Sequence, residues 1–453
     1  MAVYSIIKKS KLESAQRIDA EYYQPEYLQI TKNLNVLKAI PIREVVSNPK
    51  RKFRPEESES FRYIEISEVD LNTGEYSSSH ILSENAPDRA QWIIKQNDVI
   101  VSTVRPIRNA VSLINEGKQN LVCSSGFAVL EPKRVEPEYL FVYLKSRPLV
   151  KLLDRLTTAT MYPAVTTSDI LDTKIYLGTN NFRKEIRDKV INALKQLEQS
   201  KILYSQAENS LMEELGLKDF KPKDVLTYVV NLSNIGLANR IDAEYFQPKY
   251  EKFNQCLAKF KLETLENLCS MINYGTVPTS PYIEDFKNGT PYVKGENLSS
   301  CFIDHGKIDY LENISTKILP NKFYLKEGDI VISQMGTVGN VGVATKEEEG
   351  WLFASFTIRA RLKQNTKPFI DPLFVALYIQ NISRPYYLLR CIAQASVRQN
   401  TDLPTIKKLP IPVLPKMIQQ KIADLVRKSH ETRKKAKELL EEAKQKVEKM
   451  IDG

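Results

Sequence analysis

Eleven residues near the start of this chain occur again in its second half. Residues 17–27 read RIDAEYYQPEY and residues 240–250 read RIDAEYFQPKY, so nine of the eleven positions are identical. The two changes, at positions 23/246 and 26/249, keep the size or the solubility of the side chain. A match this dense indicates an internal duplication, and a duplicated chain is expected to fold into two copies of one scaffold.

Other stretches follow the same order in both halves. Residues 97–102 (NDVIVS) correspond to 328–333 (GDIVIS), and residues 167–170 (TSDI) correspond to 400–403 (NTDL). The separation between the copies grows by about ten residues along the chain, so the halves differ by small insertions. Between these landmarks the two halves are poorly alike. A constant scaffold with divergent loops predicts two binding modules with different targets.

Apolar spacing predicts the elements of each half. Helices are predicted at 27–37 and 137–155 in the first half, and near 251–268 and 371–391 in the second. Strands of the first half are predicted where β-branched or aromatic runs are separated by polar residues, at 61–66, 99–102, 110–113 and 126–130. The second half repeats this order, with strands and loops between residues 270 and 363.

Each half ends in a long stretch with a heptad pattern, at residues 181–216 and 416–450. The predicted contact positions are Ile186, Val190, Ala193, Leu197, Ser200, Tyr204, Ala207 and Leu211 in the first helix, and Ile418, Ile422, Leu425, Ser429, Thr432, Ala436, Leu439 and Ala443 in the second. A narrow apolar stripe requires a partner, so the two helices are predicted to pair as an antiparallel coiled coil. The alternative is that each helix packs on its own domain.

The charge of the chain favours an anionic partner. It has 65 Lys and Arg against 55 Asp and Glu, a formal charge of +10. This balance favours nucleic acid, although many proteins are mildly basic for no specific reason. A helix over 416–450 would be ~50 Å long at ~1.5 Å per residue, and one turn of B-DNA is about 34–36 Å. The helix pair could therefore space two DNA-reading domains roughly one to one and a half turns apart.

The composition predicts a cytoplasmic protein. The chain has no apolar run of about eighteen residues, and residues 1–16 lack the charged-then-apolar layout of a signal peptide. The five cysteines include no CxxC pair. We expect them to be reduced, with a zinc site as a remote alternative.

Three stretches carry a family resemblance. They are the repeated IDAEY[YF]QP[EK]Y, the run GDIVISQMGTVGNVGVA at 328–344 with its weaker counterpart NDVIVSTVRPIRNAVSLI at 97–114, and NTDLPTIKKLPIPVLPKMIQQKI at 400–422. In this order they resemble the specificity subunit of a type I restriction-modification enzyme. The resemblance implies two target-recognition domains that each read half of a split DNA site, with two long helices as the spacer. It also implies methyltransferase subunits as partners, which would bring the S-adenosylmethionine.

The repeat, the heptad patterns and the resemblance together give the predicted architecture. The fold class is α+β, with two tandem mixed α/β target-recognition domains in a pseudo-two-fold repeat, separated by a long antiparallel two-helix coiled coil. The predicted parts are a first target-recognition domain with the N-terminal repeat segment at 1–180, a central spacer helix at 181–216, a linker at 217–239, a second target-recognition domain at 240–415 and a C-terminal spacer helix at 416–453.

No catalytic motif is visible in the sequence. An Asn-Pro-Pro-Tyr-like motif is absent, and Gly336, Gly339 and Gly342 lack the spacing of a nucleotide-binding loop. A loose nuclease-like pattern at 87–88 and 116–118 is of a kind that occurs by chance in many proteins. The three histidines have no metal-ligand spacing. We therefore predict a non-catalytic subunit that itself binds no cofactor and no metal.

Loops rich in Arg, Lys, Asn, Gln and Thr are the candidates for DNA contact, because these side chains read base edges or contact phosphates. The predicted DNA-binding residues are Arg51, Lys52, Arg54, Thr103, Arg105, Arg108 and Tyr162 in the first half, and Tyr274, Thr276, Lys294, Asn297, Gln334, Thr337, Arg398 and Asn400 in the second. They belong to the loops 48–54, 102–109, 157–167, 273–276, 294–297, 333–337 and 396–400. For each residue, a solvated surface position is the alternative.

The repeated stretch is less suited to DNA, because phosphates would repel its acidic residues. Its tyrosines and prolines predict a packed joint between a domain and the coiled coil, or a docking surface for another subunit, and the two roles can coexist. The predicted joint residues are Asp19, Tyr22, Pro25, Asp242, Tyr245 and Pro248.

The predicted function is recognition of a bipartite duplex DNA site, on which the chain positions two methyltransferase subunits and the restriction (nuclease) subunits. The alternative is a two-headed protein-binding scaffold with a coiled-coil spacer, and a nuclease fused to its own DNA reader is a third possibility. Steep loss of binding with salt would favour DNA, whereas salt-tolerant binding to a folded protein would favour the scaffold. Metal-dependent cleavage by the chain alone would favour the nuclease.

Overall fold

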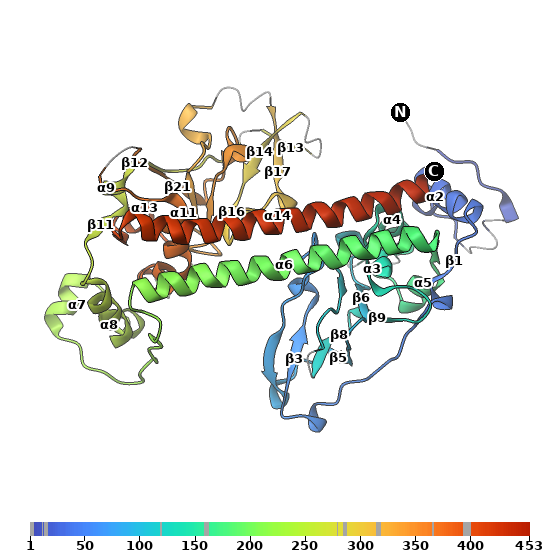
Figure 1. The fold of residues 1–453 in the computed structure, drawn as a ribbon, viewed down its shortest axis with the longest axis horizontal. Coiled ribbons are helices and arrows are strands. Elements are labelled where there is room, and N and C mark those ends of the chain that lie inside the picture. The colour runs from blue at the N-terminus through green and yellow to red at the C-terminus, as the bar shows by residue number, and fades with distance from the viewer. Residues whose placement is uncertain are drawn as a thin grey trace. The chain divides into compact units, whose positions relative to one another are not determined.

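The computed structural model describes residues 4–10, 12, 17–117, 120–157, 163–278, 280–283, 288–313, 319–364, 367–392 and 400–453. The chain divides into two compact units: unit 1 comprises residues 1–197 and 433–453, and unit 2 comprises residues 198–432. Each unit combines mixed β-sheets with helices, which confirms the α+β class (Figure 1). None of the described helices has an apolar stretch long enough for a membrane crossing.

Unit 1 is built on two four-stranded sheets. Its strands are β1 (Ile40–Pro41), β2 (Val46–Ser47), β3 (Ser60–Ile64), β4 (Ser79–Leu82), β5 (Ala90–Ile93), β6 (Val99–Ser102), β7 (Val111–Leu113), β8 (Leu121–Ser124), β9 (Phe127–Pro132) and β10 (Lys174–Ile175). The sheet orders are β2-β9-β6-β7 and β4-β3-β8-β5, and β1 pairs with β10. Only β3 and β8 run parallel among these described pairs.

Among the described residues, four further α-helices belong to the strand region of unit 1. They are α2 (Pro25–Val36), α3 (Pro137–Lys145), α4 (Arg147–Arg155) and α5 (Thr167–Asp172). The single helix predicted at 137–155 is wrong, because the chain is extended at Ser146 between α3 and α4. A continuous helix would place the ring of Pro148 against the carbonyl of Leu144, so the proline instead occupies the first turn of a new helix.

The described part of unit 2 also has two sheets and a strand pair, with additional strands. Its strands are β11 (Leu262–Thr264), β12 (Cys269–Tyr274), β13 (Tyr282–Ile283), β14 (Gly289–Val293), β15 (Leu298–Ser299), β16 (Cys301–Ile303), β17 (Asp309–Glu312), β18 (Ile330–Ser333), β19 (Val341–Val343), β20 (Leu352–Phe353), β21 (Thr357–Leu362) and β22 (Pro410–Pro412). They form the sheets β12-β21-β18-β19-β16-β15 and β13-β17-β14-β20 and the pair β11-β22.

The helices of unit 2 are α7 (Leu232–Ala238), α8 (Pro248–Leu257), α9 (Leu265–Leu268), α11 (Pro372–Tyr378), the π-helix η12 (Ile379–Leu388), α12 (Leu389–Cys391) and α13 (Leu403–Lys407). The helix predicted near 251–268 is therefore too long. Residues 262–264 leave it because they pair with β22. Residues 232–238 form a helix inside the stretch that was predicted to be a linker.

The duplication is visible in strand register. In unit 1, β6 pairs with β9 so that Ser102 faces Phe127, and in unit 2, β18 pairs with β21 so that Ser333 faces Thr357. Each of these central strands also forms an antiparallel hairpin with the next strand, β7 or β19. The residues at the end of β6 and β18 therefore occupy equivalent positions.

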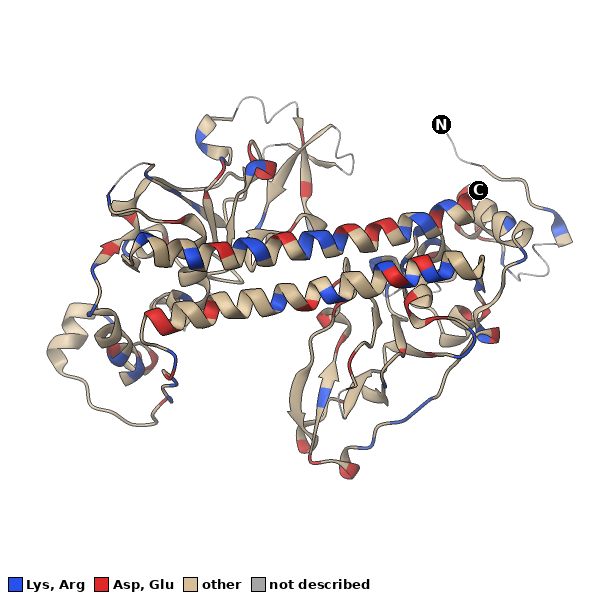
Figure 2. Ribbon diagram, viewed as in Figure 1, with Lys and Arg blue, Asp and Glu red and all other residues tan. Residues whose placement is uncertain are grey.

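Two long helices, α6 (Asn180–Glu214) and α14 (Lys416–Asp452), each contribute residues to both units. Within unit 1, Lys189 pairs with Glu442 and Glu185 pairs with Lys446. Rising numbers on one helix meet falling numbers on the other, so the helices run antiparallel there. Lys and Arg alternate with Asp and Glu along their surfaces (Figure 2).

Within unit 2, the same antiparallel pairing continues at two buried serines. The hydroxyl of Ser200 donates to the carbonyl of Ser429 at 2.8 Å, and the hydroxyl of Ser429 donates to the carbonyl of Ser200 at 2.7 Å. These bonds satisfy two polar side chains on the seam, the buried line of contact between the two helices. The helices also pack on their own unit, because Val190 and Val447 join the core of unit 1. Both packing alternatives therefore hold.

The predicted seam is correct on α6 and half wrong on α14. All eight predicted positions of α6 are buried except Tyr204, which is half-buried. On α14 the residues at the predicted positions 422, 429, 436 and 443 are buried, whereas those at 418, 425, 432 and 439 are half-buried. Val426 and Leu440 are buried instead. The sequence offers apolar residues at both neighbouring positions, so only packing selects between them.

Candidate nucleic-acid interface

In both units, the polar loop after the central strand meets the segment that precedes a short helix. In unit 1, the backbone N of Arg105 donates to the carbonyl of Pro163 at 2.7 Å, and the backbone N of Val165 donates to the carbonyl of Thr103 at 2.9 Å. In unit 2, the backbone N of Thr401 donates to the carbonyl of Gln334 at 3.1 Å. Loops that lie far apart in the sequence, 102–109 with 157–167 and 333–337 with 396–400, are thus brought together through their described parts.

A tight turn completes each of these arrangements. The N of Thr103 donates to the carbonyl of Gly126 at 2.8 Å, and the N of Gln334 donates to that of Phe356 at 2.9 Å. We define loop cluster 1 as residues 103–109, 125–126 and 163–166. Loop cluster 2 is defined as residues 334–337, 355–356 and 400–402.

The short helices fix one side of each cluster. The hydroxyl of Thr166 accepts from the N of Asp169 at 3.1 Å and caps α5. The carboxylate of Asp402 accepts from the N of Thr405 at 2.8 Å and caps α13. Both residues have extended backbones as N-caps do, so the chain turns sharply before each helix.

Loop cluster 1 presents cations. Arg108 ends a short 3-10 turn and is exposed, and Arg105 is half-exposed with a left-handed backbone (φ 49°). The 3-10 turn is anchored by Lys145, which is buried. Its ammonium donates to the carbonyls of Leu71 at 2.8 Å and Asn109 at 3.4 Å, and burial lowers the pKa of Lys145 to about 8.

The segment 48–54 of unit 1 lies elsewhere, along the edge of β5. There Phe53 N donates to the carbonyl of Gln91 at 2.8 Å. Arg51 is only 18% exposed, because its guanidinium pairs with the buried carboxylate of Asp98. Lys52 and Arg54 are exposed. We therefore keep Lys52 and Arg54 as candidates for phosphate contact and remove Arg51.

Loop cluster 2 presents uncharged polar groups. The amide of Gln334 donates to the side-chain oxygen of Asn400 at 3.1 Å. The hydroxyls of Ser333 and Thr337 lie 3.3 Å apart. Thr337 and Asn400 are exposed and Gln334 is half-exposed. Base edges are read by side chains of this kind.

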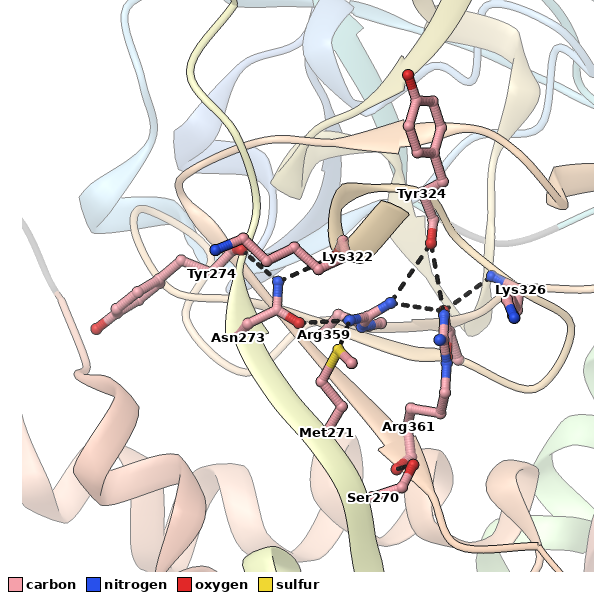
Figure 3. Close-up of polar contacts among 10 residues, drawn as sticks. Ser270, Met271, Asn273, Tyr274, Lys322, Tyr324, Lys326, Arg359 and Arg361 are labelled. Atoms are coloured by element: carbon pink, nitrogen blue, oxygen red, sulfur yellow. Dashed lines mark hydrogen bonds and ion pairs between the residues drawn. The ribbon is translucent and has the colours of Figure 1, made fainter. Parts of the chain in front are cut away.

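Tyr274 connects loop cluster 2 to the sheet. Its hydroxyl accepts from the N of Leu403 at 2.9 Å. The preceding residue, Asn273, donates to the carbonyls of Tyr274 at 2.7 Å and Lys322 at 3.3 Å, and accepts from Arg359 (Figure 3). The end of β12 is thereby fixed to a buried arginine.

That arginine belongs to a buried charge network. The guanidinium of Arg359 lies 3.4 Å from the carboxylate of Asp329, and both side chains are fully buried. Arg361 makes two further bonds to Asp329, at 2.6 and 2.7 Å. Arg359 and Arg361 also approach the carbonyl of Tyr324 (Figure 3). Asp329 is equivalent to Asp98 of unit 1, so each unit pairs an arginine with the acid that precedes its central strand.

Three predicted residues of unit 2 are engaged within the chain. Asn297 is fully buried and accepts from the N of Lys294 at 2.8 Å. Thr276 is buried and its hydroxyl donates to the carbonyl of Val277 at 3.1 Å. Both side chains are buried within the chain, so we remove both from the candidate set. Lys294 pairs with Glu296 at 2.9 Å and with Asp309 at 2.6 Å. Two other predicted residues, Tyr162 and Arg398, lie outside the described residues.

Sequence reasoning missed three exposed side chains near these loops. Phe356 is 56% exposed in loop cluster 2, and Ile107 is 49% exposed in loop cluster 1. Lys322 is exposed beside Asn273. An aromatic residue placed in a two-residue turn between strands is the feature that could have identified Phe356, because a turn offers no core to bury it.

The repeated stretch forms the same joint in both units. In unit 1, Arg17 and Asp19 pair at 2.7 Å, and this bond lowers the pKa of Asp19. The ring of Tyr22 lies under two guanidinium groups, 4.6 Å from Arg17 and 3.9 Å from Arg155. Pro25 occupies the first turn of α2. In unit 1 the joint therefore fastens the repeat to the end of α4.

Unit 2 reproduces this joint residue by residue. Arg240 pairs with Asp242 at 2.7 Å, and Tyr245 lies 4.6 Å from Arg240 and 4.4 Å from Arg390. Pro248 occupies the first turn of α8. The second arginine of each joint, Arg155 or Arg390, lies far along the chain and is not apparent from the repeat.

Comparison with known proteins finds similarity in part of this chain. Residues 258–445 match the family model described as the type I restriction modification DNA specificity domain. The type I restriction enzyme HindI specificity subunit of Haemophilus influenzae is 26% identical over 163 residues, which cover 34% of this chain and 34% of that protein. The match thus spans about a third of the length of the curated relative.

Two solved structures are also similar over most of the chain. The crystal structure of the HsdS subunit from Thermoanaerobacter tengcongensis is 19% identical, with 91% of this chain and 96% of that chain covered and a TM-score of 0.34. The crystal structure of the type I restriction-modification S subunit from M. genitalium is 13% identical, with 91% and 94% covered and a TM-score of 0.42. Residues 258–445 of this chain are thus similar to the DNA specificity domain of type I restriction-modification systems, and the curated relative is a specificity subunit of such a system.

Proposed function

We propose that this chain reads a bipartite duplex DNA site, one half with each unit. The observation that carries the proposal is the pair of loop clusters, which occupy equivalent positions after β6 and β18. Both clusters sit on the same scaffold but carry different side chains. A scaffold repeated with different reading residues is suited to two different half-sites.

The two clusters offer different chemistry to DNA. Loop cluster 1 carries Arg105 and Arg108, and an arginine can bind the O6 and N7 atoms of guanine or a phosphate. Loop cluster 2 carries Gln334, Thr337 and Asn400, which can read base edges without adding charge. Lys52, Arg54 and Lys322 are exposed cations suited to the phosphate backbone.

The long helices support a spacer role in this proposal. Helix α6 has 35 residues and α14 has 37, so each is on the order of 50 Å long at ~1.5 Å per residue. Such a length corresponds to about one and a half turns of B-DNA. The proposal therefore includes an unspecified gap of fixed length between the half-sites.

The partners in this proposal are two methyltransferase subunits and the restriction subunits. The chain is the non-catalytic component, and the S-adenosylmethionine belongs to the methyltransferase subunits. The complex acts on cellular DNA, which places it in the cytoplasm.

The repeated stretch offers two equivalent docking sites, one for each copy of the same partner, because Ile18 is 89% exposed and its equivalent Ile241 is 88% exposed. The buried side of each stretch forms the joint, and the exposed side is the proposed docking surface.

Selection of binding sites from random duplex DNA tests the proposal. The chain, purified with its methyltransferase subunits, should enrich two short motifs separated by a constant gap at physiological salt. The affinity should fall steeply with added salt, because bound counterions are released from DNA. If the folded complex enriches no sequence and instead binds a protein partner in a salt-tolerant manner, the two-headed scaffold is the correct function.

Arg108→Gln should weaken binding to all DNA sequences alike. The side chain is exposed at the end of its turn, and a phosphate contact carries no sequence information. The slope of log K against log salt should become shallower by ~0.9. Titration of one selected and one unrelated duplex at several salt concentrations measures both effects. Lys184→Gln, an exposed position on α6, is the control; an equal change in slope there would contradict the assignment.

Ile18→Asp and Ile241→Asp should each remove one methyltransferase subunit from the complex. Both side chains are almost fully exposed, so the change leaves the fold intact but places a charge in an apolar contact. Mass measurement of the purified complex should show one partner subunit lost per substitution and two lost in the double variant. An unchanged stoichiometry in the double variant would exclude this surface as the docking site.

A further inference from the structure

Phe356 is an exposed aromatic side chain held on a rigid turn. The turn is closed by a hydrogen bond from the N of Thr357 to the carbonyl of Ala354 at 2.9 Å, and the hydroxyl of Thr357 donates to the same carbonyl at 2.7 Å. Ala354 and Thr357 are buried, whereas the ring of Phe356 is 56% exposed. The protein therefore directs an apolar ring away from its core at a fixed position.

The scaffold does not require this ring. Gly126 occupies the equivalent turn position in unit 1, since it accepts from Thr103 as Phe356 accepts from Gln334. Unit 1 has no side chain at this position, and a Cβ atom at Gly126 would lie 2.7 Å from the terminal carbon of Ile66, which would have to move. The exposed ring is thus a property of loop cluster 2 alone.

Two side-chain amides belong to the same loop cluster, and the backbone of one of them, Gln334, donates to the carbonyl of Phe356 at 2.9 Å. The bond from Gln334 to Asn400 uses one N–H of the former and the oxygen of the latter. It leaves the side-chain oxygen of Gln334 as an acceptor and the amino group of Asn400 as a donor. Adenine presents the matching pair in the major groove, an N6 amino donor and an N7 acceptor. The thymine paired with it presents an apolar C5-methyl group at the same edge.

We propose that loop cluster 2 reads one A·T base pair, with Gln334 and Asn400 on the adenine and the ring of Phe356 against the thymine methyl group. This inference rests on the proposed DNA-reading function and names a specificity-determining residue for it. The backbone of Phe356 is bonded to that of Gln334, so the exposed ring belongs to the same loop cluster as the two amides. The methyl group is the apolar feature of the base-pair edge. Phe356 thereby distinguishes thymine from bases that lack the methyl group.

Uracil substitution in the DNA tests this contact directly, because uracil pairs with adenine as thymine does but lacks the methyl group. The full-length chain is used in complex with its methyltransferase subunits, on its selected duplex. Each thymine of both half-sites is replaced singly by uracil. We expect one position at which uracil weakens binding about fourfold, as expected for losing the burial of one methyl group.

Phe356→Ala should weaken binding to the thymine duplex by at least as much, and should bind the thymine and uracil duplexes equally at that position. Phe356→Leu, which keeps an apolar contact, should retain part of the discrimination. Phe369→Ala is the matched control, because that ring is 37% exposed and lies 4.9 Å from the ammonium of Lys416, outside loop cluster 2. It should discriminate as the unmodified chain does.

Two results would overturn the inference. One is a position-specific preference for thymine that persists in Phe356→Ala, and the other is the absence of any A·T pair with such a preference. Both presuppose sequence-selective binding by the unmodified complex. If that binding itself is absent, the proposed function fails as well, so the two failures are distinguishable.

Discussion

Asp329→Ala should lower the free energy of unfolding of unit 2 by roughly 3–5 kcal/mol, because it leaves a buried charge without its partner. The side chains of Asp329 and Arg359 are both fully buried, and Arg361 bonds to the same carboxylate. The carboxylate also accepts from the N of Lys326 at 2.8 Å. The loss is large because burial disfavours the charged form of Arg359 and lowers its pKa, and the carboxylate of Asp329 offsets this cost.

Urea unfolding followed by tryptophan fluorescence measures this loss. The chain has two tryptophans, one in each unit, so Trp351 reports unit 2 in a Trp92→Phe background. Asp98→Ala in unit 1, followed through Trp92, is the matched comparison. It should cost less, because its partner Arg51 is partly exposed and water can solvate the guanidinium. Equal losses in the two units would contradict the assigned role of burial.

Gly275→Ala should destabilise unit 2 by about 3 kcal/mol, at the upper end for overpacking. A Cβ atom at Gly275 would lie 2.2 Å from the carbonyl oxygen of Phe353 and 2.3 Å from that of Ala354. Both are backbone atoms, so no side-chain rotation relieves the clash. The end of β12 must move away from the turn that carries Phe356, and base discrimination by loop cluster 2 should fall with the stability.

Gly236→Ala is the control for this change. No atom lies within 4 Å of the Cβ position there, and the residue lies inside helix α7. Alanine is favoured over glycine in a helix by roughly 0.5–1 kcal/mol, so this variant should be neutral or slightly more stable. Thermal unfolding and site selection on both variants provide the comparison. A Gly275→Ala chain with unchanged stability and unchanged discrimination would refute the close approach.

The sequence alone established the duplication and the elements that local pattern encodes. The repeated RIDAEY stretch predicted two equivalent scaffolds, and the strand register at Ser102 and Ser333 agrees with it. The buried face of α6 was predicted because its residues recur at alternating steps of four and three along the helix. These features depend on residues close in sequence, whose periodicity determines which face is buried.

Tertiary structure decided which predicted loop residues remain available for a ligand. Arg51 and Asn297 belong to loops of suitable composition, yet one pairs with an internal carboxylate and the other is buried. The partner of Arg51 lies 47 residues away along the chain, and the burial of Asn297 depends on how unit 2 packs, so composition could not reveal either. Composition could not reveal Phe356 either, because its exposure depends on the turn that carries it and on the bond from Gln334, in the loop after β18, to its carbonyl.

Each joint contains residues that the sequence repeat predicted and one arginine that only the fold could identify. The sequence determined that Asp19 and Tyr22 recur as Asp242 and Tyr245, because the repeat is written in adjacent residues. Only the fold decided that Arg155 and Arg390 would cover those tyrosines, since each arginine arrives from a helix more than a hundred residues away. Periodicity and repetition in the sequence predict local conformation. Contacts between segments that are distant along the chain form only when the whole core packs.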